Sequence, residues 1–190
     1  VTAQQVSGVR LKDMDKELFE IKEIKEAKKT KEIDETNNKH YILTMELLRS
    51  GRYLDEMDFE NAEYNYNQIL EEFKDSECFD EHTRNIVLSE LFFINMIKED
   101  TLNNQYNEDL NEIYPKVKDF LEKHPKNTFV KRIFYTYYLL IEKNPKKAEQ
   151  TWNDFYYSYN RHVIKGSLYS EEALMKYVKK IAIEKGIINN

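Results

Sequence analysis

Residues 51–70, GRYLDEMDFENAEYNYNQIL, contain the end of one predicted helix, a short polar turn and the start of the next. Asp58 stands where the second helix would begin, and its short acceptor side chain suits an N-cap. Ala62, Tyr66 and Ile69 then recur at intervals of three and four, the period of one helix face. The stretch predicts two antiparallel helices, at about 40–56 and 59–73, joined by a tight turn.

The rest of the chain continues in the same helical manner. Its 190 residues include only 4 Gly and 3 Pro, too few for the turns of an all-β protein of this size. Apolar periodicity predicts helices at about 11–34, 40–56, 59–73, 80–98, 106–123, 129–142, 145–160 and 170–186. We expect residues 1–10 to form a tail, residues 36–38 to interrupt the first helix, and Pro115 to kink or divide the fifth. A loop is expected at Gly166 and Ser167.

The predicted helix pairs recur at about 43–45 residues. Ala148 occupies the place of Ala62, Trp152 that of Tyr66, and Phe155 that of Ile69. A small side chain lets two antiparallel helices approach closely, and aromatic side chains one turn later fill the space between successive pairs. This regularity predicts an array of stacked pairs, with an irregular helical bundle as the alternative.

The stretch GRYLDEMDFENAEYNYNQIL resembles a tetratricopeptide repeat. Tyr53 lies nine residues before Ala62, Tyr66 falls on the large apolar position of the repeat, and Gly51 is one place from its usual small residue. The repeats are degenerate, because their spacing exceeds the standard 34 residues. The resemblance implies an all-α, right-handed array of about three antiparallel helix pairs plus a terminal capping helix. We expect this domain at 37–190, after a tail and amphipathic helix at 1–36.

Two further segments, SGVRLKDMDKELF (7–19) and IKGSLYSEEALMKYVKKI (164–181), resemble the region after the last membrane span of bacterial site-2-type intramembrane zinc metalloproteases. The resemblance implies a soluble C-terminal region at the cytoplasmic face of the membrane, attached to a membrane protein upstream. The zinc motif of that family is absent from this sequence, so no catalytic residue is carried over. The abundance of Lys, Asn, Ile and Tyr, which have AT-rich codons, also indicates a bacterial source.

Charge and cysteine content narrow the function classes. The net charge is −6, with −8 in residues 37–82 and +6 in residues 126–190. An acidic chain is poorly suited to general nucleic-acid binding, which requires neutralisation of phosphates. The single cysteine, Cys78, cannot form an internal disulfide and has acidic neighbours, which suppress thiol reactivity. A reducing, cytoplasmic location is expected.

Catalytic and metal-binding patterns were sought among the histidines and glycines. His40, His82, His124 and His162 are 38 to 42 residues apart, and none has a second His or Cys at the spacing of a zinc site. The sequence contains no phosphate-binding glycine loop. We therefore expect no catalytic residue, no metal and no cofactor.

The remaining expectation is a module that binds a protein or peptide. Stacked helix pairs form a curved surface that can hold a peptide or a helix. The expected groove residues lie on the first helix of each pair: Tyr41, Met45, Tyr53, Phe93, Arg132 and Tyr137. A free intracellular adaptor or peptide sensor is the alternative setting, and an enzyme of unrecognised type is the alternative class. The oligomeric state stays open.

Overall fold

The computed structural model describes residues 3–98, 114, 115, 117–161 and 165–190, and within these ranges it is helical and contains no strand. This confirms the predicted all-α class. The chain divides into two compact units, residues 1–44 and 45–190, and the boundary lies within the first helix. The right-handed, tetratricopeptide-like arrangement stays a prediction.

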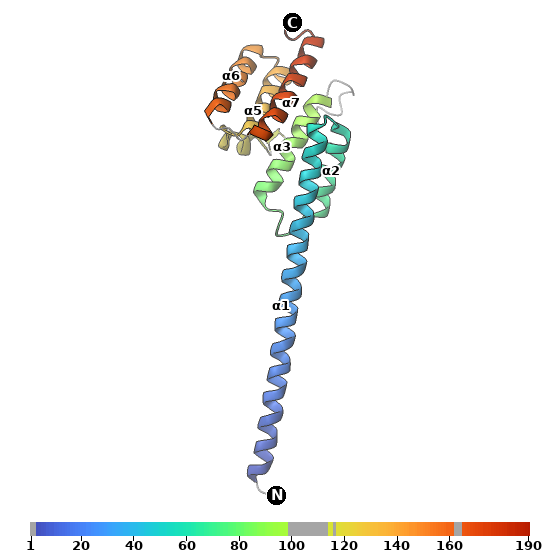
Figure 1. The fold of residues 1–190 in the computed structure, drawn as a ribbon, viewed down its shortest axis with the longest axis vertical. Helices are drawn as coiled ribbons and strands as arrows, with labels where there is room; N and C mark the ends of the chain where they lie inside the picture. The colour runs from blue at the N-terminus through green and yellow to red at the C-terminus, as the bar shows by residue number, and fades with distance from the viewer. Residues whose placement is uncertain (1–2, 99–113, 116, 162–164) are drawn as a thin grey trace. The chain divides into compact units, whose positions relative to one another are not determined.

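The first helix, α1 (Ala3–Asp55), is continuous, so the predicted tail over 1–10 and the predicted interruption at 36–38 are both wrong (Figure 1). Asn costs only about 0.7 kcal/mol relative to Ala inside a helix, which is too little to break one. Thr36 also stays in the helix, and its Oγ1 donates to the carbonyl oxygen of Glu32 at 2.9 Å. The described side chains between Lys22 and Ile42 are exposed.

In the second unit the end of α1 pairs with α2 (Phe59–Glu72), as predicted. Asp58 caps α2 by accepting from the backbone N–H of Asn61 at 3.2 Å. The buried amide of Asn65 donates to Ser50 Oγ at 2.8 Å and to the carbonyl oxygen of Glu46 at 3.0 Å, which fixes the alignment of the two helices. The α1–α2 turn reverses the chain at Met57, whose φ is 59°.

The next elements pack around α5 (Thr128–Thr136) (Figure 1). It contacts α3 (Glu81–Lys98), α6 (Pro145–Arg161) and α7 (Lys165–Glu184), and continues directly into a π-helical turn, η1 (Tyr137–Ile141). Residues 117–123 are also helical, whereas most of the segment before Pro115 lies outside the described residues. Because α7 begins at Lys165, Gly166 and Ser167 belong to a helix, and the predicted loop there is wrong.

The core of the second unit lies along α3 and α5. Residues 89–97 of α3 are all buried, so this half of the helix is covered on every side. Fully buried apolar side chains come from each of the packed helices: Phe92, Phe93, Ile94, Met96, Ile133, Leu139, Phe155, Leu174 and Met175. Such close packing fixes the positions of neighbouring helices. It therefore also fixes the shape of the grooves that these helices form at the surface.

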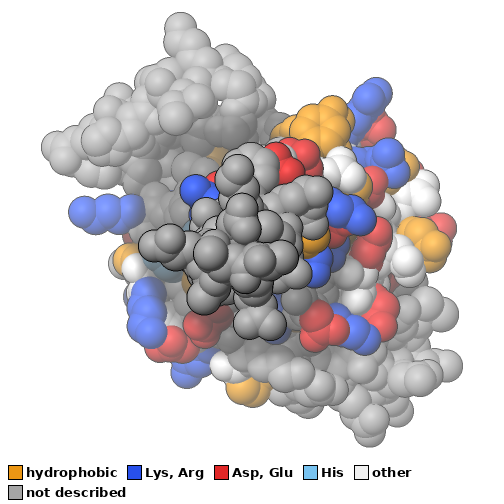
Figure 2. Space-filling model, turned by 90° about the horizontal axis from the view of Figure 1, so that it is seen from below, with side chains coloured by type: hydrophobic (Ala, Val, Ile, Leu, Met, Phe, Trp, Pro, Cys, Tyr) orange, Lys and Arg blue, Asp and Glu red, His pale blue; other side chains and the backbone are white. Residues whose placement is uncertain are grey.

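The surface outside this core is mixed in charge. On the face drawn in Figure 2, Lys and Arg side chains lie among Asp and Glu side chains, and hydrophobic side chains form separate spots. Because the charges are mixed, the chemistry of a binding partner is better inferred from individual hollows than from the charge of the whole face.

Two glycines provide a test of the backbone. Gly186 ends α7 with φ at 69°, whereas Gly51 lies inside α1, and a Cβ added at either residue would meet nothing within 4 Å. We expect Gly186→Ala to destabilise the protein by about 1 kcal/mol, because an L side chain disfavours the left-handed backbone. Gly51→Ala should stabilise it by up to about 1 kcal/mol, because alanine is the better helix former. Urea unfolding measures both, and effects of the same sign would contradict these backbone conformations.

Candidate functional site

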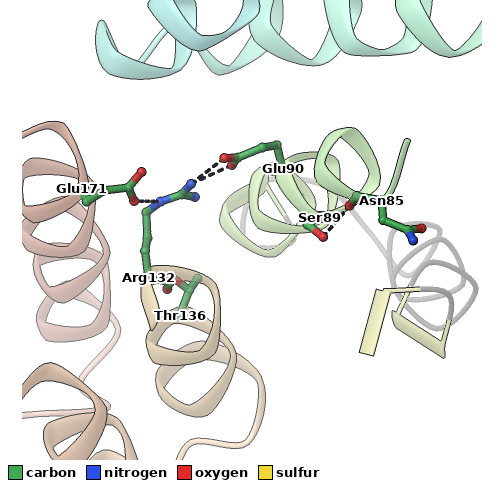
Figure 3. A network of polar contacts seen from close by, with 6 residues as sticks. All are labelled: Asn85, Ser89, Glu90, Arg132, Thr136 and Glu171. Atoms are coloured by element: carbon green, nitrogen blue, oxygen red, sulfur yellow. Dashed lines mark hydrogen bonds and ion pairs between the residues drawn. The ribbon is translucent and has the colours of Figure 1, made fainter. Parts of the chain in front are cut away.

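Arg132 joins three helices from inside the core (Figure 3). From α5 its Nη2 donates to both carboxylate oxygens of Glu90 on α3, each at 2.7 Å, while its Nε donates to Glu171 on α7. The side chain of Arg132 is 0% exposed, and those of Glu90 and Glu171 are 10% and 15% exposed. The ring of Phe93 lies 4.2 Å from the guanidinium carbon. We call these two glutamates and the arginine the Arg132 junction.

The Arg132 junction contains more negative charge than positive charge. Burial raises the pKa of Glu90, and Glu171 raises it further, while Arg132 only partly opposes the change. Burial alone would lower the pKa of Arg132, but the two carboxylates more than offset this effect. Arg132 Nη1 is buried and has no hydrogen-bond partner among the described residues. The junction therefore has unequal charges and one unused donor, and it holds helices together without an open site.

An open hollow of about 370 Å³ lies beside the same helices. Its walls come from α5, η1, α6, α7 and the residue that follows the turn at Gly186: Tyr135, Leu139, Pro145, Ala148, Glu149, Trp152, Asn153, Lys179 and Ile188. We call it the Trp152 hollow. Its lining combines apolar side chains with three polar ones. In ligand sites of this composition the apolar side chains bury a group of the ligand, and the polar side chains fix the orientation of the ligand.

Trp152 provides the aromatic surface of this hollow. The indole is half-buried, its centroid lies 5.2 Å from that of Tyr135, and the Lys179 ammonium lies 5.9 Å above the indole ring. Burial raises the pKa of Tyr135 to about 12, so its hydroxyl stays neutral at physiological pH. A tryptophan on a rigid helix, with charged groups only at the rim, can bury an apolar side chain without burying an unpaired charge.

The structure buries two of the six groove residues predicted from the sequence. Phe93 and Arg132 contact each other, but both are 0% exposed, so their prediction as residues of an open groove is wrong. Phe93 is buried because residues 89–97 of α3 are covered on every side, and Arg132 is buried because Glu90 and Glu171 neutralise its charge.

The other four predicted residues are at least partly exposed. Tyr41 lies in the first unit and is 64% exposed, and Met45 is 46% exposed. Tyr53 and Tyr137 are half-buried, and the ring of Tyr137 stacks on that of Tyr114 at 4.7 Å between centroids. Tyr41, Met45 and Tyr53 lie on α1, whereas Tyr137 lies in η1.

Glu90, Glu171 and Trp152 were not among the predicted site residues. Glu90 had a signal in the sequence, since it stands alone in the apolar run IVLSELFFINMI, where a carboxylate must find a partner. Glu171 had none, because it was read as an acidic residue near the start of a helix. Trp152 was recognised as a repeat position, which explains its packing but not its exposed edge.

The structure brings two of the four histidines together. The rings of His82 and His124 lie 5.6 Å apart, and both contact Phe120. Across the described residues, no group of three or more His, Cys, Asp or Glu side chains could hold a metal ion. Cys78 is half-buried, with its Sγ 3.0 Å from Ser76 Oγ. No helix in the described ranges combines the length and apolar character that a membrane span requires.

The unequal charges of the Arg132 junction predict a pH effect. A carboxyl whose pKa is higher in the folded state contributes stability that is complete below its unfolded pKa, about 4.3, and is lost as pH rises through the folded pKa. Glu90→Gln removes this pH-dependent loss of stability, because an amide does not ionise. The stability of the variant relative to the wild type should therefore increase as the pH rises above about 4.3, the unfolded pKa of a glutamate. Urea unfolding at several pH values measures this difference.

Two variants control this experiment. Glu72→Gln changes an exposed glutamate at the end of α2 and should alter stability by less than about 0.5 kcal/mol. Arg132→Met leaves two buried carboxylates without their cation and should cost about 3–5 kcal/mol at neutral pH. A Glu90→Gln advantage that shrinks as pH rises would show that burial of the charged carboxylate is favourable on balance.

Comparison of the chain with protein-family models, with curated proteins and with solved structures gave no match.

Proposed function

We propose that this chain is a non-catalytic helical module that binds a protein or peptide, and that the Trp152 hollow receives an apolar side chain of the partner. The observation that carries the proposal is a half-buried tryptophan in a hollow of about 370 Å³ with a polar rim. Aromatic anchor sites of this kind dominate the binding energy of many protein interfaces.

Rigidity of the walls supports this role. Tyr135 and Leu139 reach the hollow from α5 and η1, and Lys179 reaches it from α7. The Arg132 junction ties α5 to α7, so the walls keep their spacing when the hollow is empty. A preformed site loses little conformational entropy on binding. More of the free energy gained by burying the apolar side chain therefore contributes to affinity.

The setting of the module follows from the sequence resemblances. We propose a tetratricopeptide-like docking or regulatory domain at the cytoplasmic face of a membrane metalloprotease, with a free adaptor or peptide sensor as the alternative. The residues that precede Val1 in the full reading frame distinguish the two. A site-2-type zinc motif and membrane spans there would support the first, and a start codon at this point would support the second.

Trp152 is the only tryptophan of the chain, so its fluorescence reports directly on the hollow. We expect capped decapeptides of Gly and Ser with one central Leu or Phe to shift the Trp152 emission on titration. Replacing the central residue by Ser should weaken binding about 10- to 100-fold, because burial of a large apolar side chain contributes about 1.5–3 kcal/mol.

Calorimetry on variants completes this test. Trp152→Ala should weaken binding of the Leu peptide at least tenfold. Tyr64→Ala removes a 65% exposed aromatic side chain from α2, outside the hollow, and should leave the affinity unchanged. The proposal fails if Leu and Phe peptides at about 1 mM, a free energy near −4.1 kcal/mol, produce neither an emission shift nor binding heat.

A further inference from the structure

A second hollow, of about 510 Å³, also has a wall from α7. It is bounded by the turn before α2, the start of α2, the end of α3 and the last turns of α7. Its lining residues are Met57, Asp58, Phe59, Glu60, Ile97, Lys98, Tyr177, Ile181 and Glu184. We call it the acidic hollow, and it shares no lining residue with the Trp152 hollow.

The floor of the acidic hollow is apolar and aromatic. The ring of Phe59 lies 5.4 Å from that of Tyr177 and 6.4 Å from that of Phe93, measured between centroids. Phe59, Tyr177 and Ile181 are half-buried, so each keeps part of its side chain accessible. Phe93 in turn lies beneath Arg132, so the floor rests on the Arg132 junction. Such a floor can bury one apolar side chain of a partner.

The rim of the acidic hollow is negatively charged. Asp58, Glu60 and Glu184 contribute carboxylates, and the ammonium of Lys98 is paired with Glu63. Asp58 is held in place by the backbone N–H of Asn61 and by its side-chain amide, at 3.2 and 2.7 Å. The rim therefore presents fixed negative charge around an apolar floor.

Glu184 is the rim residue that most favours binding of a cation. It ends α7, where the helix dipole is negative and a carboxylate is unfavourable. Its ion pair with Lys180 is long, at 3.9 Å, and the side chains of Glu184 and Lys180 are 64% and 74% exposed, so the pair contributes little. A cation brought by a partner would offset both the local dipole and the neighbouring carboxylates.

We propose that the acidic hollow binds a basic segment of a partner protein, in which one bulky apolar residue is flanked by lysine or arginine. The apolar residue packs on Phe59, Tyr177 and Ile181, and the flanking cations lie near Glu60 and Glu184. Nucleic acid and anionic lipid surfaces are repelled by this rim because their phosphates have the same sign of charge. An uncharged peptide would contact the apolar floor but would form no ion pair with the carboxylates of the rim. This inference goes beyond the proposed function, because it concerns a different hollow and a different ligand charge.

The probe is a fluorescein-labelled, capped decapeptide with a central Leu flanked by two Lys on each side, and anisotropy reports its binding to the full chain. Replacing the central Leu by Ser should weaken binding about tenfold, and replacing the four Lys by Glu should abolish it at low salt. Affinity should also fall as NaCl rises from about 0.01 M to 0.15 M, because the Debye length shrinks from about 30 to 8 Å.

Matched charge reversals locate the site. The double variant Glu60→Lys with Glu184→Lys changes two exposed side chains of the rim and should weaken binding about tenfold or more. The control, Glu72→Lys with Glu77→Lys, changes the net charge equally at exposed positions outside the hollow and should have a much smaller effect.

Equal weakening by the two double variants, or equal affinity for the Lys and Glu peptides, would overturn the inference. Failure here is distinguishable from failure of the proposed function. The Trp152 emission reports the other hollow, and the Glu60→Lys, Glu184→Lys double variant should leave the emission shift caused by the uncharged Leu peptide unchanged.

Discussion

Arg132 is the constraint on which the second unit depends. A guanidinium buried in an apolar core is costly unless its charge and its donors are matched, and the two matching carboxylates come from different helices. The helices α3, α5 and α7 can therefore be packed only in a register that brings all three side chains together. Apolar packing alone tolerates small shifts of one helix along another, whereas a bidentate ion pair does not.

This register also accounts for the two hollows. Each hollow has a wall from α7, the Trp152 hollow has a wall from α5, and the acidic hollow has a wall from α3. The junction that joins these three helices is buried, so it contributes no contact to a ligand. Its role is to hold the walls of the two hollows at a fixed spacing. The residues that would contact a ligand are those of the walls, which the junction positions.

Local order in the chain could be predicted from the sequence, and contacts between distant residues could not. The bounds of α2, the cap at Asp58 and the start of α6 at Pro145 follow from the spacing of a few neighbours, and the structure confirms them. Residues 36–38 were misjudged because weak propensities were treated as a break, although no Gly or Pro enforces one. Arg132 was placed in a groove because its partners are 42 and 39 residues away, beyond the reach of any helical period.

The π-helical turn η1 has a consequence for the number of residues that this helix can hold. Its backbone N–H of Glu142 bonds to the carbonyl oxygen of Tyr137, five residues earlier, so this turn accommodates one residue more than an α-helical turn. A helix that gains one residue can take it up in such a turn and retain the packing on either side. A homologue with one residue fewer between Arg132 and Pro145 would close the same turn as an ordinary α-helix. It would keep the ion pairs of Arg132 and would differ in the side chain that faces the Trp152 hollow from η1, so variation in ligand preference could arise by insertion as well as by substitution.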